Sequence, residues 1–313
     1  MNIDIRAMKI WVFCLGLAGL ACGVSAAAQS VAFTFDDGPQ LKTTPRMSPA
    51  ERNKSMLDAL AKHGVKATLF VTSSFGADRP EGLAMARAWG EAGHTIGNHT
   101  VTHPDLHLEK TTLKAYQEEI FACDRVIAPL PGYRKWFRFT FLREGNTPEK
   151  REGMRNFLKE IGYRNAYVSL DTSDWRLESK LIETLEKDAK ADIAPIRQAY
   201  LDHISQRMDA YRELSQKLQG RDIAQVMLMH HNLINALWLD DAIALVKAKG
   251  WKIVSPDEAF ADSVYQLQPE RPAAGQSLLI SMARVLGMGR FAGWERLVDD
   301  GDHEIAALKA KGL

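Results

Sequence analysis

The chain has 313 residues, of which 46% are hydrophobic and 25% are charged, and its formal net charge is +1. This length and composition support one large domain with a sizeable core, or one domain with a small appendage. The balanced charge, with no basic block interleaved with aromatic residues, argues against nucleic-acid binding, and no protein partner is evident.

The first 28 residues have the pattern of a signal peptide. Arg6 and Lys9 precede an uncharged apolar run at residues 10–24, and small residues follow at 25–28. We expect cleavage near Ala28 and export to the periplasm or the medium. An uncleaved membrane anchor is the alternative, although the run is short for a spanning helix.

Strand and helix patterns alternate strictly along residues 29–262, which we expect to form the main domain. Strands are expected at residues 31–37, 66–71, 94–98, 136–141, 166–170, 223–229 and 251–254. Helices are expected at residues 49–63, 80–92, 109–127, 148–161 and 236–249. This alternation predicts an α/β domain with a parallel sheet flanked by helices, either open or closed into a barrel.

Two segments depart from this alternation. Residues 177–220 are expected to be helical with a break near Pro195, and they form either a lid or an outer layer. Their dense charges favour a solvated outer layer. Residues 263–313 are interrupted by proline and glycine, and we expect them to pack on the barrel as a C-terminal tail.

Polar residues lie in or just after the last parts of the predicted strands. Asp36 and Asp37 end the first strand, His99 and His103 follow the third, and Arg138 lies in the fourth. Asp174 and Trp175 follow the fifth strand, and His230 ends the sixth. In a barrel of parallel strands, the active site lies at the carboxyl ends of the strands. One pocket can therefore collect all of these side chains.

Two of the histidines and one carboxylate match a metal site. His99 and His103 are four residues apart, a spacing that places both rings on one face of a helical turn. Asp37 would be the third protein ligand. Two histidines and a carboxylate leave a position open for water, as in catalytic zinc sites, and the same set fits iron or cobalt. The sequence therefore predicts a divalent metal, with zinc as the first choice.

The other polar residues suit the proton transfers of hydrolysis. Asp36 can take a proton from a metal-activated water, and His230 can protonate a leaving group. Asp174 can hold and charge that imidazole, and Arg138 can keep Asp36 ionised.

Three points stay open at this stage. His231 competes with His230, because neighbouring residues at a strand end point in different directions. Trp175 either walls a small apolar pocket or is a core aromatic. The pair Asp36 and Asp37 can also be a capping feature before a loop.

Four of these motifs occur in a fixed order along the chain. They are Thr34-Phe35-Asp36-Asp37-Gly38-Pro39, His99-Thr100-x-x-His103, Asp171-x-x-Asp174-Trp175 and Leu228-Met229-His230. Their order resembles that of the NodB-homology polysaccharide deacetylases, carbohydrate esterase family four. The resemblance spans residues 29–262 and implies a distorted (β/α)7 barrel with metal-dependent deacetylase activity. It assigns Asp36 as base, Asp37, His99 and His103 as metal ligands, His230 as acid, Asp174 as its partner, and Arg138 as the residue that orients Asp36.

One motif departs from the family pattern. The family carries an arginine followed by proline and an aromatic residue, whereas here Thr140 stands between Arg138 and Phe141 in place of the proline. The resemblance implies that the backbone N–H at the aromatic position binds the oxyanion, and Phe141 can keep that role. Without the proline ring φ is not fixed, so the geometry of the acetyl pocket stays open.

Three functions fit these residues. The first is removal of N-acetyl groups from amino-sugar polymers of the peptidoglycan, chitin or poly-N-acetylglucosamine type. The second is O-acetyl esterase activity on a xylan-like polysaccharide. The third is non-catalytic carbohydrate binding, which a missing base or ligand would favour. In each case the expected partner is a polysaccharide.

Overall fold

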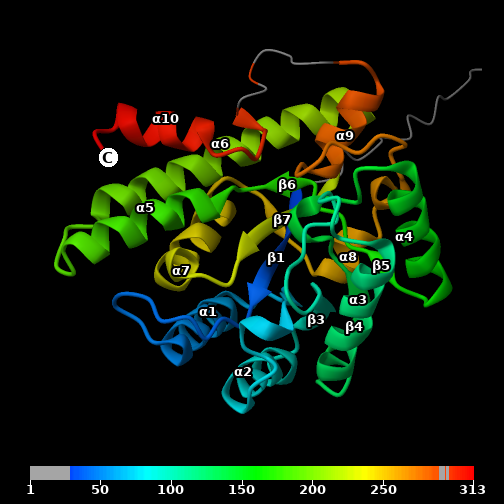
Figure 1. The fold of residues 1–313 in the computed structure, drawn as a ribbon. Helices are drawn as coiled ribbons and strands as arrows, with labels where there is room; N and C mark the ends of the chain where they lie inside the picture. Colours follow the sequence, from blue (N-terminus) through cyan, green and yellow to red (C-terminus); the bar gives the residue numbers. More distant parts are fainter. Residues whose placement is uncertain (1–28, 289–292, 294–295) are drawn as a thin grey trace, which may run out of the picture.

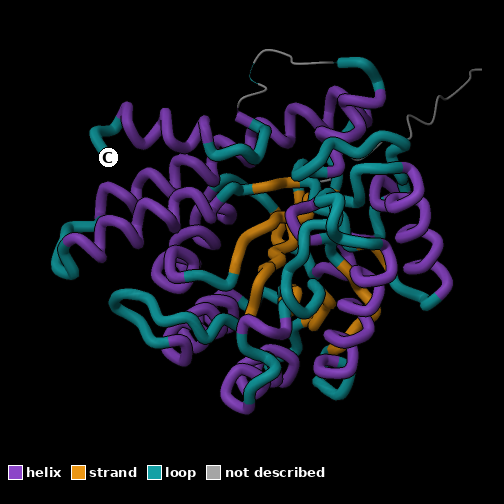
Figure 2. Tube along the Cα trace, viewed as in Figure 1, coloured by secondary structure: helices purple, strands orange, loops and turns teal. Residues whose placement is uncertain are grey.

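The computed structural model describes residues 29–288, 293 and 296–313. The predicted signal peptide, residues 1–28, lies outside this part of the chain. Within the described residues, no helix is both long and apolar enough to cross a membrane. The strands run through the middle of the fold and the helices surround them (Figures 1 and 2).

The strands form one curled parallel sheet. They are β1 (Ser30–Gly38), β2 (Thr68–Val71), β3 (Thr95–Asn98), β4 (Tyr133–Phe137), β5 (Arg164–Asn165), β6 (Leu170–Asp171), β7 (Ala224–His230) and β8 (Lys252–Ile253). Their order is β5-β4-β3-β2-β1-β7-β6, and β8 pairs with the start of β1. All pairs are parallel, as the alternation predicted.

The segment between β5 and β6 bridges the two edges of this sheet. Ala166 N–H donates to Phe137 O of β4 at 2.7 Å, and Ser169 N–H donates to Val226 O of β7 at 3.2 Å. The predicted fifth strand at 166–170 is therefore wrong: it is two short strands joined by a crossing segment. The curled sheet is a distorted barrel, since no ladder joins β5 to β6 within the described residues.

Helices cover the sheet on its outside. They are α1 (Pro49–His63), α2 (Pro80–Glu91), α3 (Leu113–Ile127), α4 (Pro148–Glu160), α5 (Asp174–Lys187), α6 (Ala194–Gln219), α7 (Leu233–Ala248), α8 (Pro256–Phe260), α9 (Leu278–Val285) and α10 (Asp302–Ala310). Short 3-10 helices in the described part of the chain include η1 (Ser73–Phe75), η2 (Thr140–Leu142) and η3 (Ser263–Gln266). Helix α1 begins with a capping box formed by Ser48 and Glu51.

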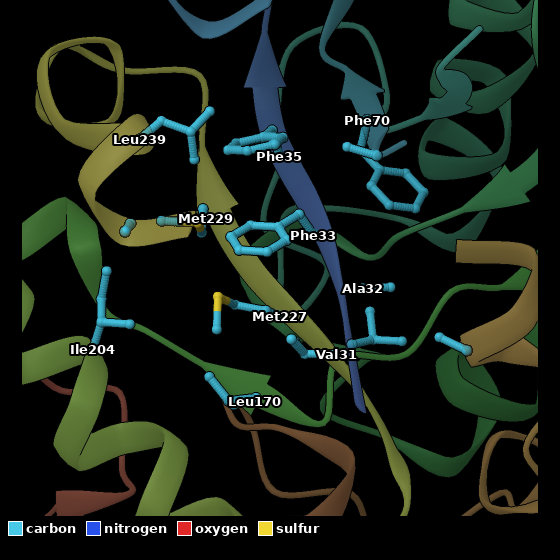
Figure 3. Packing of buried hydrophobic residues seen from close by; sticks show 14 of the residues in the cluster. Val31, Ala32, Phe33, Phe35, Phe70, Leu170, Ile204, Met227, Met229 and Leu239 are labelled. Atoms are coloured by element: carbon cyan, nitrogen blue, oxygen red, sulfur yellow. The ribbon is translucent and has the colours of Figure 1, made fainter. Parts of the chain in front are cut away.

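Strand β1 separates an apolar outer face from a polar inner face. Successive side chains of a strand point to opposite faces. Figure 3 shows Phe33 and Phe35 of β1 on the side of the helices, where they pack with Met227 and Met229 of β7, Ile204 of α6 and Leu239 of α7. Thr34 and Asp36 therefore face the barrel interior, where both contact Arg138.

The fourth strand begins and ends earlier in the chain than the predicted range 136–141, since it spans Tyr133–Phe137. It ends at Phe137, and residues 140–142 form η2 instead of continuing the strand. Phe141 and Leu142 have φ values of 55° and 50°, which no strand accommodates. The strand therefore stops before Arg138, and the chain turns there. We call this edge of the barrel, where the carboxyl ends of the strands lie, the rim.

Helix α6 is more deeply buried than the charge-rich sequence indicated. Tyr200, Ile204, Met208 and Tyr211 recur at spacings of three and four residues and are almost fully buried. The prediction of a solvated outer layer is therefore wrong for this helix: its dense charges lie beside a narrow apolar stripe. In the C-terminal segment, α9 packs on α6, and α10 packs on α5 and α6.

Truncating a buried side chain on the helix-facing side of β1 should destabilise the fold. Phe33 is fully buried, and Phe33→Ala should lower the free energy of unfolding by about 3–5 kcal/mol through lost burial and the cavity left behind. Leu286→Ala is the control, because Leu286 is 64% exposed. Urea unfolding followed by tryptophan fluorescence measures both, and equal losses would contradict the packing of β1.

Candidate active site

Asp36 and Asp37 lie at the carboxyl end of β1 and reach the same rim by different routes. Asp36 points into the barrel, where Arg138 Nη1 donates to its Oδ1 at 2.7 Å. Asp37 would point to the opposite face in a regular strand, but its φ of 64° turns it back. Its Oδ1 lies 3.4 Å from His103 Nε2 and 3.7 Å from His99 Nε2.

The two histidines converge through a loop and not through a helical turn, so that part of the prediction is wrong. His99 follows β3 and its N–H donates to Val71 O at 2.9 Å. Thr100 and His103 have φ values of 72° and 57°, which no right-handed helix contains. Two left-handed residues fold the loop back, so the donor atoms of Asp37, His99 and His103 all lie within 4.8 Å of one another.

Hydrogen bonding and burial fit His99 for metal binding. Its Nδ1 lies 2.8 Å from Arg138 O, so this nitrogen carries the proton and Nε2 keeps its lone pair for the site. Burial, helped by the nearby His103, lowers the pKa of His99 to about 3. A neutral imidazole is the form that coordinates metals. The His103 ring packs against the rings of Phe75 and Phe141.

Asp36 and Arg138 form an ion pair that is almost inaccessible to solvent. Their side chains are 3% and 1% exposed. Arg138 Nη1 also donates to Thr34 Oγ1 at 2.7 Å, and its Nε donates to Ala166 O at 3.1 Å. Burial raises the pKa of Asp36, and Arg138 opposes that shift. The pair therefore places an oriented carboxylate directly beside the candidate metal ligands.

His230 lies next to Asp36 on the neighbouring strand. The two residues are register partners of β7 and β1. His230 Nδ1 lies 2.6 Å from Asp174 Oδ1, and Asp174 Oδ2 accepts from the His230 backbone N–H at 3.0 Å. Burial alone would lower the pKa of His230, but Asp174 raises it to about 10. The imidazolium therefore has a fixed partner and faces the rim with its other nitrogen.

His231 points away from this rim. Its side chain is fully buried against Trp89, and its Nε2 lies 3.1 Å from Asn53 Oδ1. Burial lowers the pKa of His231 to about 4. The geometry therefore places His230, and not His231, among the candidate site residues.

Phe141 and Trp175 are the exposed aromatic residues at the rim. Phe141 is 49% exposed and its ring centroid lies 4.4 Å from that of His103. Trp175 is 37% exposed, and its Nε1 donates to Asp299 Oδ1 at 2.8 Å. Thr140 is anchored without a proline ring, since its N–H donates to the Tyr116 hydroxyl at 3.2 Å.

Several supporting residues were missed by sequence reasoning. Glu119 of α3 accepts from the N–H groups of Val101 and Thr102 and so holds the loop between His99 and His103. Asn232 and Asn235 donate to Asp174 Oδ2 at 3.1 and 2.6 Å. The two asparagines carried a usable signal, because Asn232 is the N-cap of α7 directly after His230. Glu119 carried none, since it lies in an ordinary amphipathic helix.

The fold and the site define a parallel α/β barrel with a candidate metal-dependent hydrolytic centre. The family model for polysaccharide deacetylases matches residues 23–166. A peptidoglycan-N-acetylglucosamine deacetylase of Bacillus cereus is 34% identical over 149 residues, which are 47% of this chain and 46% of that protein. A chitooligosaccharide deacetylase of Sinorhizobium fredii is 39% identical over 102 residues, covering 31% of this chain and 42% of that protein.

The solved structures show the same fold. One of a peptidoglycan N-acetylglucosamine deacetylase has a TM-score of 0.50 and 24% identity, covering 76% of this chain and 91% of that one. Residues 23–166, a little under half of the chain, therefore resemble the polysaccharide deacetylases in sequence, and the fold resembles that of a solved deacetylase. The distorted (β/α)7 barrel predicted from the motifs is thereby confirmed. Each of the two named relatives is matched over less than half of its own length.

Removing the partner of His230 should reverse its pKa shift. In metal-free protein the pKa of His230 is expected near 10, and Asp174→Asn should bring it below about 6.5, because burial remains and the opposing charge is lost. The stability supplied by the pair is full below the unfolded pKa of about 6.5 and is lost as pH rises through 10. NMR titration of ¹⁵N-labelled histidines measures the pKa; an unchanged value in the variant would contradict the pairing.

Proposed function

We propose that the chain is an exported, divalent-metal-dependent hydrolase that removes N-acetyl groups from amino-sugar polymers. The observation that carries this proposal is the convergence of three groups at one rim. They are the ligand set Asp37, His99 and His103, the buried pair Asp36–Arg138, and the pair His230–Asp174. The named relatives act on peptidoglycan N-acetylglucosamine and on chitooligosaccharide, which supports the N-acetylglucosamine class.

The metal would be held by Asp37, His99 and His103. Two imidazole nitrogens and one carboxylate oxygen suit zinc with one position open, and the same donors suit iron or cobalt. The orientation of His99 by Arg138 O and the partial exposure of Asp37 and His103, at 17% and 15%, fit an open catalytic site. When bound, a divalent cation supplies Lewis-acid activation of the acetyl carbonyl and of water.

The chain itself supplies the proton transfers. Asp36 accepts the proton of the attacking water, and Arg138 holds its carboxylate in place. The tetrahedral intermediate collapses as His230 donates a proton to the departing amine nitrogen, with Asp174 stabilising the imidazolium. The amide N–H of Phe141 is assigned to the oxyanion, and the rings of Phe141 and Trp175 wall the acetyl pocket.

The protonated state of His230 favours amide cleavage over ester cleavage. An amine leaves a tetrahedral intermediate only after protonation, whereas an alkoxide is a better leaving group and depends less on an acid. The strong His230–Asp174 pair therefore suits an N-acetyl substrate. Non-catalytic carbohydrate binding is disfavoured, because the base, the three ligands and the acid are all present.

An acetate-release assay tests this function. The mature chain should release acetate from N-acetylglucosamine oligomers, and chelation of divalent metal should abolish the release. Acetylated xylan is the comparison substrate, and added zinc, cobalt or iron compares the metals. Faster release from the xylan would make the enzyme an O-acetyl esterase, and no release from either substrate would favour the binding function.

Substitutions of the two adjacent aspartates should have different effects, one on turnover and the other on metal binding. Asp36→Asn should retain the metal and lose about 10²–10⁴-fold in kcat, because an amide cannot accept a proton. Asp37→Asn and His103→Ala should lose metal, and excess zinc should partly restore Asp37→Asn. His63→Ala is the control, since His63 pairs with Asp240 outside the site. Metal analysis with kinetics decides, and zinc rescue of Asp36→Asn alone would reverse the two roles.

Export is proposed from the charge and hydropathy of residues 1–28. Peptidase cleavage should follow Ala28, because small residues end the apolar run there. N-terminal sequencing of protein from the periplasm or the medium measures the cleavage point. Recovery of membrane-bound protein with Met1 intact would show an anchor instead.

A further inference from the structure

A buried ion pair joins the long helix α6 to the C-terminal helix α10. Arg207 of α6 and Glu304 of α10 are each about 1% exposed. Arg207 Nη2 lies 2.5 Å from Glu304 Oε1. Neither residue belongs to the motifs of the active site, and both lie in the two segments that departed from the strand–helix alternation.

Arg207 also reaches two further segments with the same nitrogen. Its Nη2 donates to Ser173 Oγ at 2.9 Å and to Val298 O at 3.0 Å. One guanidinium therefore connects α10, the segment before it, and the loop that enters α5. Because Arg207 is buried, each of these contacts is screened little by solvent.

The loop held by Arg207 carries the residues that face His230. Ser173 is the N-cap of α5 and directly precedes Asp174, whose Oδ1 lies 2.6 Å from His230 Nδ1. Ser173 has a φ of 47°, a left-handed conformation that an L residue keeps only when its surroundings enforce it. The hydrogen bond from Arg207 acts on the side chain of this strained residue.

Two more contacts from the same segments hold this loop. His203, one turn before Arg207 on α6, lies with Nε2 2.7 Å from Thr172 O. Burial and the charge of Arg207 lower the pKa of His203 to about 3, so the neutral ring donates this bond. After Ser173 and Asp174 in the chain, Trp175 donates from its Nε1 to Asp299 Oδ1 at 2.8 Å. The loop is thus fixed at Thr172, Ser173 and Trp175 by groups outside the motifs.

We propose that Arg207 is a positioning residue for the Asp174–His230 pair, and that Glu304 holds Arg207 for this task. The inference rests on the proposed function, since it assigns part of the catalytic geometry to α6 and to the C-terminal segment. An apolar pair could fill the same space, and such replacements of buried ion pairs are often neutral or stabilising. An apolar pair could not, however, hold the Ser173 hydroxyl and the Val298 carbonyl together.

The test uses a variant that removes the ion pair and keeps the packing. In Arg207→Met/Glu304→Leu neither charge is left buried alone, so the fold should be retained. The pKa of His230 in metal-free protein should fall from about 10 toward its ordinary value, because Asp174 is no longer held against it. Turnover of N-acetylglucosamine oligomers should drop about 10- to 100-fold in kcat with little change in KM, as for other residues that orient a reacting group.

A matched control lies on the same helix. Arg212 of α6 forms an ion pair with Asp222, and within the described residues neither side chain hydrogen-bonds to residues 171–175. Arg212→Met/Asp222→Asn should therefore leave the pKa of His230 and the kcat unchanged. Ser173→Ala is a second variant, which removes only the acceptor and keeps the Arg207–Glu304 pair; it should shift the pKa of His230 in the same direction by a smaller amount.

The outcomes separate this inference from the proposed function. If the wild type releases no acetate but the pKa of His230 falls in Arg207→Met/Glu304→Leu and in Ser173→Ala, the positioning role stands and the proposed substrate is wrong. If both variants fold and keep the pKa of His230 and the kcat of the wild type, the inference is overturned. Should the double variant not fold, the result for Ser173→Ala decides by the same criterion.

Discussion

The contact between Arg138 and Asp36 inside the barrel determines how the rest of the site is built. A carboxylate buried this deeply is stable as an anion only with a charged partner, and Arg138, which directly follows β4, supplies that partner inside the barrel. The same arginine offers its backbone carbonyl to His99 and its Nε to Ala166. One residue therefore connects the candidate base, a candidate metal ligand and the segment that bridges the sheet edges.

The parallel sheet explains why these groups meet at all. Strands β1, β3 and β7 all have their carboxyl ends at the same edge of the sheet. Asp36, Asn98 and His230 therefore lie near that edge together, although they are far apart in sequence. Helices on the outside hold the strands in place through an apolar layer, which leaves the inner face free for polar contacts. The candidate site is thus confined to the rim, where the chain leaves each strand and its backbone is free to turn.

Short-range patterns predicted much of the fold and selected the candidate site residues. The capping box of Ser48, the alternation along β1 and the order of the motifs are all local in sequence. The shape of the loop after His99 was not predictable, because left-handed residues there are threonine and histidine and not glycine. Nor was the pair Arg207–Glu304, whose members are 97 residues apart. A charge in a charge-rich helix gives no sign that it will be buried, since burial depends on what packs on it later in the chain.

The left-handed residues at the rim have a consequence for how this chain tolerates change. Asp37, Thr100, His103, Phe141 and Ser173 all carry positive φ without being glycine, and such residues cost on the order of 1–3 kcal/mol each. This strain offsets part of the stabilisation supplied by the core. The net free energy of unfolding is therefore smaller, and the fold tolerates fewer destabilising substitutions elsewhere. Glycine at any of these positions would relax the backbone but remove the side chain that the rim requires. A substitution that stabilises the backbone at one of these residues is therefore expected to weaken the candidate site, so stability and function make opposite demands on the same few residues.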